Sequence, residues 1–111
     1  VYPHLRLEKE VGIREDEVPE SLKIVIFRVL QEAMNNCAKH SGGDFLSIAL
    51  RKNETGIELV IEDNGPGFDP GNASRGLGMG SMTERTENSG GVFSVFSTRG
   101  AGTCVRATWV L

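Results

Sequence analysis

The sequence predicts an α/β fold, a two-layer sandwich in which a mixed sheet carries helices on one face. A long segment, residues 19–40, repeats apolar side chains at the spacing of an α-helix. Several shorter segments alternate apolar and polar residues with a period of two, as half-buried strands do. Their order along the chain is strand, helix, two strands, loop, helix and two strands, which is typical of helices packed against one side of a sheet.

The length and composition indicate a single globular domain over residues 1–111. The formal net charge of -3 disfavours nucleic acid as the main partner, because nucleic-acid-binding domains usually carry a basic face. No apolar run is long enough to span a membrane, so we expect a cytoplasmic domain without membrane contact, and leave membrane anchoring of a parent protein open. The chain begins at Val1 rather than Met, which we interpret as a fragment of a longer protein.

The long helix is expected to begin at Pro19 and Glu20 and to end near His40, before Gly42 and Gly43. One side of this helix forms an apolar stripe that we assign to the core: Leu22, Ile26, Val29, Leu30, Ala33 and Cys37. Cys37 and Cys104 show no metal-ligand spacing and are predicted to be reduced thiols.

The remaining elements follow from alternation and from glycine-rich turns. We expect strands at residues 4–11, 45–52, 57–63, 92–97 and 103–111, the first of them short or at an edge, and a second helix at about 77–88. The residues predicted to face inward are Leu46, Ile48, Leu50, Ile57, Leu59 and Ile61. In the last strand, one face is predicted to carry Val105, Ala107, Trp109 and Leu111.

Three polar residues share one margin of the long helix: Glu32, Asn36 and Lys39 are spaced by four and three positions. Asn36 offers an uncharged oxygen suited to magnesium, which keeps water and phosphate as its other ligands. Lys39 suits a phosphate, and Glu32 suits a general base. Each residue alone is explained more simply as a solvated side chain on the helix surface.

Asp63 lies at the core-facing end of an apolar strand. An unpaired buried carboxylate is costly, so Asp63 needs a partner in the protein or in a ligand. When Asp63 is considered alone, a role in an Asx turn with Asn64 and Gly65 is an equally good interpretation.

Glycine-rich turns follow this strand and open the second helix, at residues 63–69 and 76–80. Free N–H groups at a helix start, approached closely past glycine, suit a phosphate, although a turn without a ligand is the simpler interpretation. The Walker pattern is absent, and no dinucleotide-binding motif is in register.

Taken together, these motifs resemble a known family. The segments QEAMNNCAKHS from Gln31, DNGPGFD from Asp63, GLGMGSMTER from Gly76 and GAGT ending at Thr103 closely resemble the ATP-binding catalytic domain of two-component sensor histidine kinases, in the subfamily with a QEAxxNxxKH helix motif. The resemblance implies the Bergerat ATP-binding fold, with Mg-ATP bound between the long helix and the loop after Asp63.

The resemblance also implies roles for individual residues. Asp63 would accept a hydrogen bond from the adenine amino group, Asn36 would bind magnesium, Lys39 would contact phosphate and Glu32 would act as the base. The other nucleotide-binding residues that it implies are Gly65, Gly67, Gly76, Leu77, Gly78, Met79 and Thr103.

The implied activity is transfer of the γ-phosphoryl group of ATP to a histidine on an adjoining dimerisation domain, upstream of a response regulator. That acceptor domain is missing here, and neither His4 nor His40 is expected to replace it, so the chain alone should turn over poorly. The alternatives are a conformational ATPase of the gyrase or heat-shock chaperone type, an anti-sigma-factor serine kinase, or a degenerate module that serves only as an interaction surface.

Overall fold

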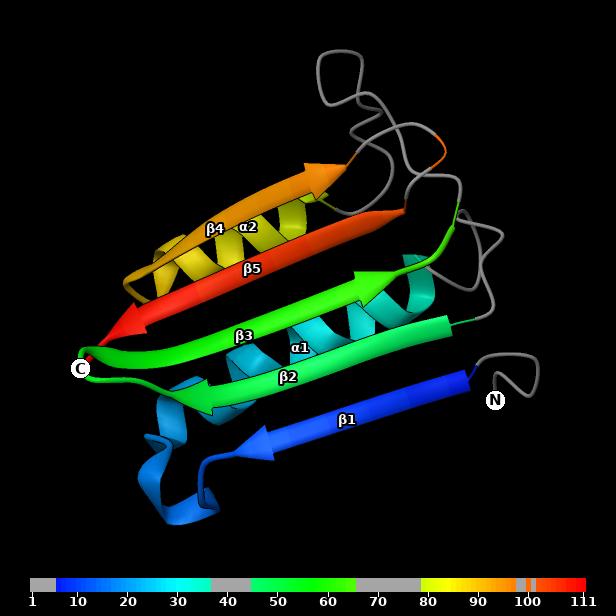
Figure 1. Ribbon diagram of the computed structural model, residues 1–111. Helices are drawn as coiled ribbons and strands as arrows, with labels where there is room; N and C mark the ends of the chain where they lie inside the picture. The colour runs from blue at the N-terminus through cyan, green and yellow to red at the C-terminus, as the bar shows by residue number, and fades with distance from the viewer. Residues whose placement is uncertain (1–5, 37–44, 66–78, 98–99, 101) are drawn as a thin grey trace.

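The computed structural model describes residues 6–36, 45–65, 79–97, 100 and 102–111. A five-stranded sheet has the order β1-β2-β3-β5-β4, with β1 parallel to β2 and the other pairs antiparallel. Both α-helices lie on the same face of this sheet, α1 behind β2 and β3 and α2 behind β4 and β5 (Figure 1). The predicted two-layer α/β sandwich is therefore confirmed.

The element bounds agree closely with the sequence prediction. The strands are β1 (Arg6–Gly12), β2 (Phe45–Lys52), β3 (Gly56–Asp63), β4 (Gly91–Ser97) and β5 (Thr103–Val110), and the helices are η1 (Glu15–Glu17), α1 (Glu20–Asn36) and α2 (Met79–Asn88). The predicted extension of the long helix to His40, and the start of the second helix at Leu77, lie outside the described residues.

Helix α1 begins as its sequence predicts. The carbonyl oxygen of Pro19 accepts hydrogen bonds from the N–H groups of Leu22 and Lys23 at 2.9 and 3.2 Å, which starts the helical pattern immediately after proline. Its buried stripe packs on the sheet, and α2 contributes the fully buried Met82. The main core residues are Leu22, Ile26, Val29, Ala33, Leu46, Ile48, Ile57, Leu59, Ile61, Met82, Val105, Ala107 and Trp109.

The predicted last strand, residues 103–111, is one residue too long at its end. Leu111 follows the last residue of β5 and its side chain is 65% exposed. The N–H of Leu111 donates to the carbonyl of Thr55, so the chain is still anchored to the β2–β3 turn there, but the core does not extend to this end of the sheet. Leu30 and Leu50 are only partly buried beside the core.

The C-terminus of α2 is fastened to β5 through a side-chain contact. The indole N–H of Trp109 donates to the Ser89 hydroxyl at 2.8 Å, and the single hydrogen of that hydroxyl has the carbonyl oxygens of Arg85 and Thr86 as acceptors, at 3.0 and 2.8 Å. Gly90, at φ +88, then ends the helix in a left-handed conformation that glycine adopts without strain. This contact fixes where α2 lies on the sheet.

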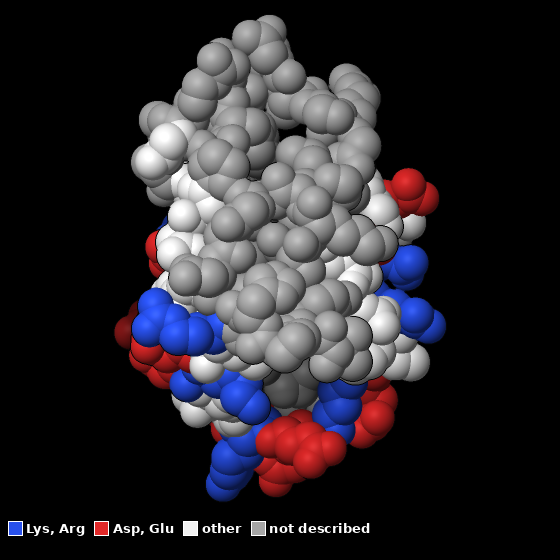
Figure 2. All heavy atoms as spheres, turned by 90° about the vertical axis from the view of Figure 1, so that its right-hand side faces the viewer, with Lys and Arg blue, Asp and Glu red and all other residues white. Residues whose placement is uncertain are grey.

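Charged side chains of both signs are mixed on the described surface. Figure 2 shows the end of the molecule at which β3 ends and β5 begins, with lysines, arginines, aspartates and glutamates interspersed along its sides and lower margin. On this view the described residues form no patch of a single sign. No described helix is both long enough and apolar enough to cross a membrane.

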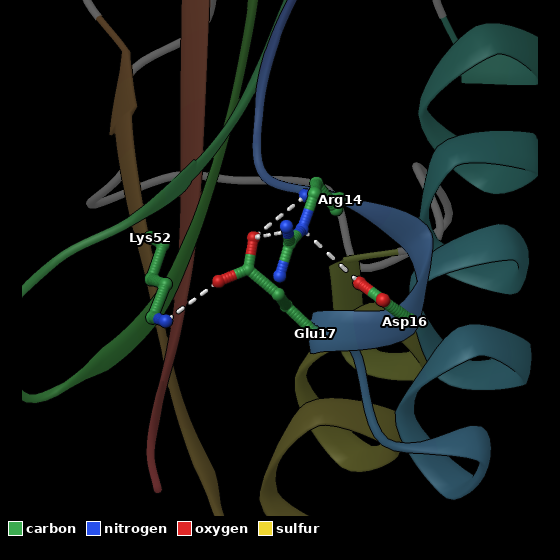
Figure 3. A network of polar contacts seen from close by, with 4 residues as sticks. All are labelled: Arg14, Asp16, Glu17 and Lys52. Atoms are coloured by element: carbon green, nitrogen blue, oxygen red, sulfur yellow. Dashed lines mark hydrogen bonds and ion pairs between the residues drawn. The ribbon is translucent and has the colours of Figure 1, made fainter.

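A polar network connects η1 to the end of β2 (Figure 3). Lys52 contacts the Glu17 carboxylate at 2.6 Å, and the other oxygen of Glu17 accepts from the N–H of Arg14 at 3.0 Å. The hydrogen bond from Lys52 is the main reason that the pKa of Glu17 lies below its ordinary value. Arg14 also pairs with Asp16 at 3.3 Å. The network positions the connection that leads into α1.

Candidate nucleotide-binding site

Three polar residues form a row across neighbouring strands at one end of the sheet. Thr103, the first residue of β5, lies opposite Asp63 in the ladder with β3 and opposite Ser97 in the ladder with β4. Asp63 and Ser97 are the last residues of their strands. Antiparallel pairing thus brings together residues that are far apart in sequence, on the side of the sheet that carries the helices.

Asp63 is a half-buried carboxylate held by backbone donors. The N–H of Gly65 donates to its Oδ1 at 2.9 Å, and the N–H of Thr103 also donates to the carboxylate. Burial raises the pKa of Asp63 above its ordinary value, and these two hydrogen bonds offset part of that effect. Asp63 therefore makes the turn contact expected of an Asx residue and remains oriented toward the helices.

Beside this carboxylate lies a small cavity of about 20 Å³. Its lining combines two polar residues with apolar side chains from both helices and three strands: Asp63 and Thr103 with Ala33, Leu46, Ile61, Met82 and Val105. A space of this size accommodates about one water molecule. The described residues therefore place a carboxylate and a hydroxyl at the edge of an apolar wall.

Close backbone packing holds the row together. Gly102 has φ +85, and a Cβ at this position would overlap the carbonyl oxygen of Asp63. On the other side, the Asn64 side chain accepts a hydrogen bond from the N–H of Phe45 at 3.0 Å, which joins the end of β3 to the start of β2. The position of Asp63 is therefore determined by the strands on both sides.

The structure brings together some of the predicted site residues. Asp63 and Thr103 line the cavity together with Ala33 of α1, and Gly65 contacts Asp63 through its N–H. Glu32 is partly buried on α1, and Asn36 is the last described residue of that helix, as Met79 is the first of α2. The predicted sites at Lys39, Gly67, Gly76, Leu77 and Gly78 lie outside the described residues.

No role was predicted for two residues of the site, Ser97 and Gly102, although Gly102 lies within the GAGT segment. A period of two places Ser97 on the same face of the strand as Phe93 and Val95, and this alternation could have indicated that Ser97 faces the core. Among the described residues, no group of three or more His, Cys, Asp and Glu side chains could hold a metal ion.

Comparisons with known proteins identify the family of the chain. Residues 22–111 match the family described as histidine kinase-, DNA gyrase B- and HSP90-like ATPase. The chain is 35% identical over 88 residues to the signal transduction histidine-protein kinase/phosphatase UhpB of Salmonella typhimurium, and 40% identical over 81 residues to the sensor histidine kinase YhcY of Bacillus subtilis. These matches cover 79% and 71% of the chain, but only 18% and 21% of the two relatives.

Solved structures show the same fold. The Erythrobacter litoralis EL346 blue-light activated histidine kinase superposes with a TM-score of 0.80 at 18% identity, over 97% of this chain and 36% of that one. The ATP-binding domain of PrrB from Mycobacterium tuberculosis gives a TM-score of 0.71 at 21% identity, over 98% of this chain and 82% of that one. With its sheet, its acidic residue at the cavity and these matches, the chain belongs to the histidine kinase-, DNA gyrase B- and HSP90-like ATPases, as an ATP-binding domain of the sensor histidine kinase type.

Proposed function

We propose that this chain binds Mg-ATP and presents its γ-phosphoryl group to a histidine on an adjoining dimerisation domain, within a two-component signalling protein. The observation that carries the proposal is the partly buried Asp63 carboxylate, which lies with Thr103 at the edge of an apolar cavity between both helices and the sheet. A carboxylate that is disfavoured by burial gains from a ligand that donates a hydrogen bond to it. The adenine amino group is such a donor.

The proposed roles follow the position of each residue along the chain. Asp63 accepts from the adenine amino group, and Thr103 supports the same edge of the base with its hydroxyl. The apolar side chains beside these two residues, which include Ala33 and Met82, would border the same edge of the base. Gly65 is buried beside Asp63 and holds the carboxylate through its N–H.

At the phosphate end, Asn36 would contribute the magnesium ligand and Lys39 a phosphate contact. Glu32 is one turn before Asn36 on α1 and would orient or deprotonate the attacking histidine. Bound Mg-ATP supplies the phosphoryl group, and the protein contributes mainly positioning and neutralisation of charge. Gly67, Gly76, Leu77, Gly78 and Met79 complete the proposed nucleotide contacts.

The partners belong to the whole protein. The chain spans about a fifth of the length of UhpB and of YhcY, so we propose that residues 1–111 form one domain of a longer sensor kinase. In this proposal the histidine acceptor lies on a dimerisation domain of the same protein, and a response regulator receives the phosphoryl group. We place this domain in the cytoplasm.

Calorimetric titration of the 111-residue chain with ATP, with and without magnesium, tests the proposal. Saturable binding should be lost in Asp63→Asn, with retained folding checked by its melting curve. Glu62→Gln is the matched control, because this neighbouring carboxylate is exposed on the opposite face of β3 and should not contribute to binding. Failure of the intact chain to bind ATP would instead favour a module that serves only as an interaction surface.

A further inference from the structure

The hydrogen-bond direction at Thr103 is determined by its neighbour Ser97. The Ser97 hydroxyl donates to the carbonyl oxygen of Gly102 at 3.0 Å, and it also lies 3.0 Å from the hydroxyl of Thr103. A hydroxyl has a single hydrogen, and a carbonyl oxygen can only accept. Because the Ser97 hydrogen points at Gly102, the hydrogen between the two hydroxyls belongs to Thr103.

This direction decides what Thr103 can offer a ligand. With its hydrogen directed at Ser97, the Thr103 oxygen has only lone pairs left for the cavity. Asp63, directly opposite in the β3–β5 ladder, is also an acceptor while it is ionised. The polar edge of the cavity therefore consists of two acceptors, and it should favour a ligand group that donates hydrogen bonds.

We infer that Ser97 is a positioning residue that holds the Thr103 hydroxyl as an acceptor, and thereby favours a purine with an amino group at position 6 over one with an oxo group there. The inference rests on the proposed function, because it assumes that the base binds beside Asp63 and Thr103. An amino group can donate to both oxygens, whereas an oxo group would face two acceptors. An oxo group that faces two acceptors is left without a donor, and such a mismatch separates the affinities of two ligands more strongly than a difference in shape does.

The test compares the affinities of the 111-residue chain for ATP and for inosine triphosphate, which carries an oxo group at position 6, by calorimetry. In Ser97→Ala, the Thr103 hydroxyl is released and can turn to donate to the oxo group. We expect the preference for ATP to fall by about 5- to 10-fold, the value of one ordinary hydrogen bond. Ser97→Thr keeps a hydroxyl at this position and should show the same preference for ATP as the intact chain.

Two further variants separate this role from a general effect on folding. Ser94→Ala removes a hydroxyl from the same strand on the opposite face, opposite Arg106, and should leave the preference unchanged. In a Thr103→Val background, Ser97→Ala should have no further effect on the preference, because Ser97 acts through the missing hydroxyl. These comparisons use ratios of affinities, so a moderate loss of stability does not affect them.

The outcomes distinguish the two proposals. If the intact chain binds ATP but Ser97→Ala keeps the same preference, or changes it equally with and without the Thr103 hydroxyl, the role of Ser97 is refuted and the proposed function stands. If the intact chain binds neither nucleotide, the proposed function fails and the role of Ser97 fails with it.

Discussion

Gly102 lies so close to the backbone of Asp63 that a side chain at this position would overlap the Asp63 carbonyl oxygen. Gly102 immediately precedes β5 and lies beside Asp63, the last residue of β3, and its backbone is in the left-handed region, at φ +85. The position therefore excludes a Cβ for two separate reasons, backbone conformation and space. The candidate site depends on both.

Gly102→Ala should destabilise the fold and also impair ATP binding. The left-handed conformation costs a non-glycine residue about 1–3 kcal/mol, and relief of the overlap requires β3 and β5 to move apart beside Asp63. Urea unfolding measures the first effect and calorimetry with ATP the second. Gly90→Ala is the control, because Gly90 has φ +88 with nothing near its missing Cβ, so it should lose stability while keeping ATP affinity. Equal ATP affinity in both variants would show that the overlap does not matter to the site.

The carboxylate of Asp63 should make the stability of the nucleotide-free chain depend on pH. Burial raises its pKa in the folded state above the ordinary value of 3.8, so the folded chain holds this proton more tightly than the unfolded chain. The resulting stabilisation is complete below the unfolded pKa and is lost as the pH rises through the folded pKa. The unfolding free energy of the wild type, minus that of Asp63→Asn, should therefore increase as the pH falls from 7 toward 3.8.

Urea titrations of both proteins across this range provide the measurement. Other titrating groups contribute equally to the two proteins and cancel in the difference. A difference that stays constant with pH would mean that the hydrogen bonds from Gly65 and Thr103 fully offset burial. A difference that decreases toward acid would mean that they outweigh burial. Either result would show that the pKa of Asp63 is not raised.

Glu32→Gln should separate binding from phosphoryl transfer. The substitution keeps the size of the side chain on α1 and removes its basicity, so ATP affinity should stay within about twofold, while transfer to an acceptor domain supplied in trans falls by roughly 10²- to 10⁴-fold. Glu84→Gln, which neutralises an exposed carboxylate on α2, is the control for charge. Unchanged transfer in Glu32→Gln would remove this residue from the mechanism.

Ser89→Ala should lower the free energy of unfolding by about 1–3 kcal/mol, the usual cost of leaving a buried donor without a partner. The donor is the indole N–H of Trp109, whose side chain is only 2% exposed. Thermal unfolding measures the loss, with Asn88→Ala as a neighbouring exposed control expected to change little. In a Trp109→Phe background the donor is absent, and Ser89→Ala should then cost clearly less. An equal cost in both backgrounds would mean that this hydrogen bond contributes nothing measurable.

Most of the fold could be predicted from local patterns. The bounds of β2 were predicted without error and those of β3 to within one residue, because alternation there runs without interruption between turns. The same alternation predicts that Leu111 shares a face with Val105, Ala107 and Trp109. Alternation defines a face only while the strand continues, and β5 ends at Val110. The residue at which the sheet ends depends on how the strands pair with one another, so it cannot be predicted from one strand's sequence.

The site was predicted less completely, for a physical reason. Asp63 could be predicted as a site residue because a carboxylate at the inward end of an apolar strand needs a partner in the protein or in a ligand. No local pattern predicts a role for Ser97, because a serine at a strand end is ordinary, and Gly102 was noted only as part of the GAGT segment. Their importance arises from β5 pairing between β3 and β4, a long-range register that brings Ser97, Thr103 and Asp63 into one row.

The hydrogen bond from Trp109 to Ser89 also makes Trp109 an intrinsic fluorescent probe of α2. Trp109 is the only tryptophan in the sequence, and its indole ring is enclosed between β5 and the C-terminal end of α2. The α2 N-terminal end, where Met82 lines the cavity beside Asp63, belongs to the same short helix. Any tilt of α2 as the cavity fills would alter the hydrogen bond at its other end, so the emission wavelength of this single fluorophore would follow the helix without an added label.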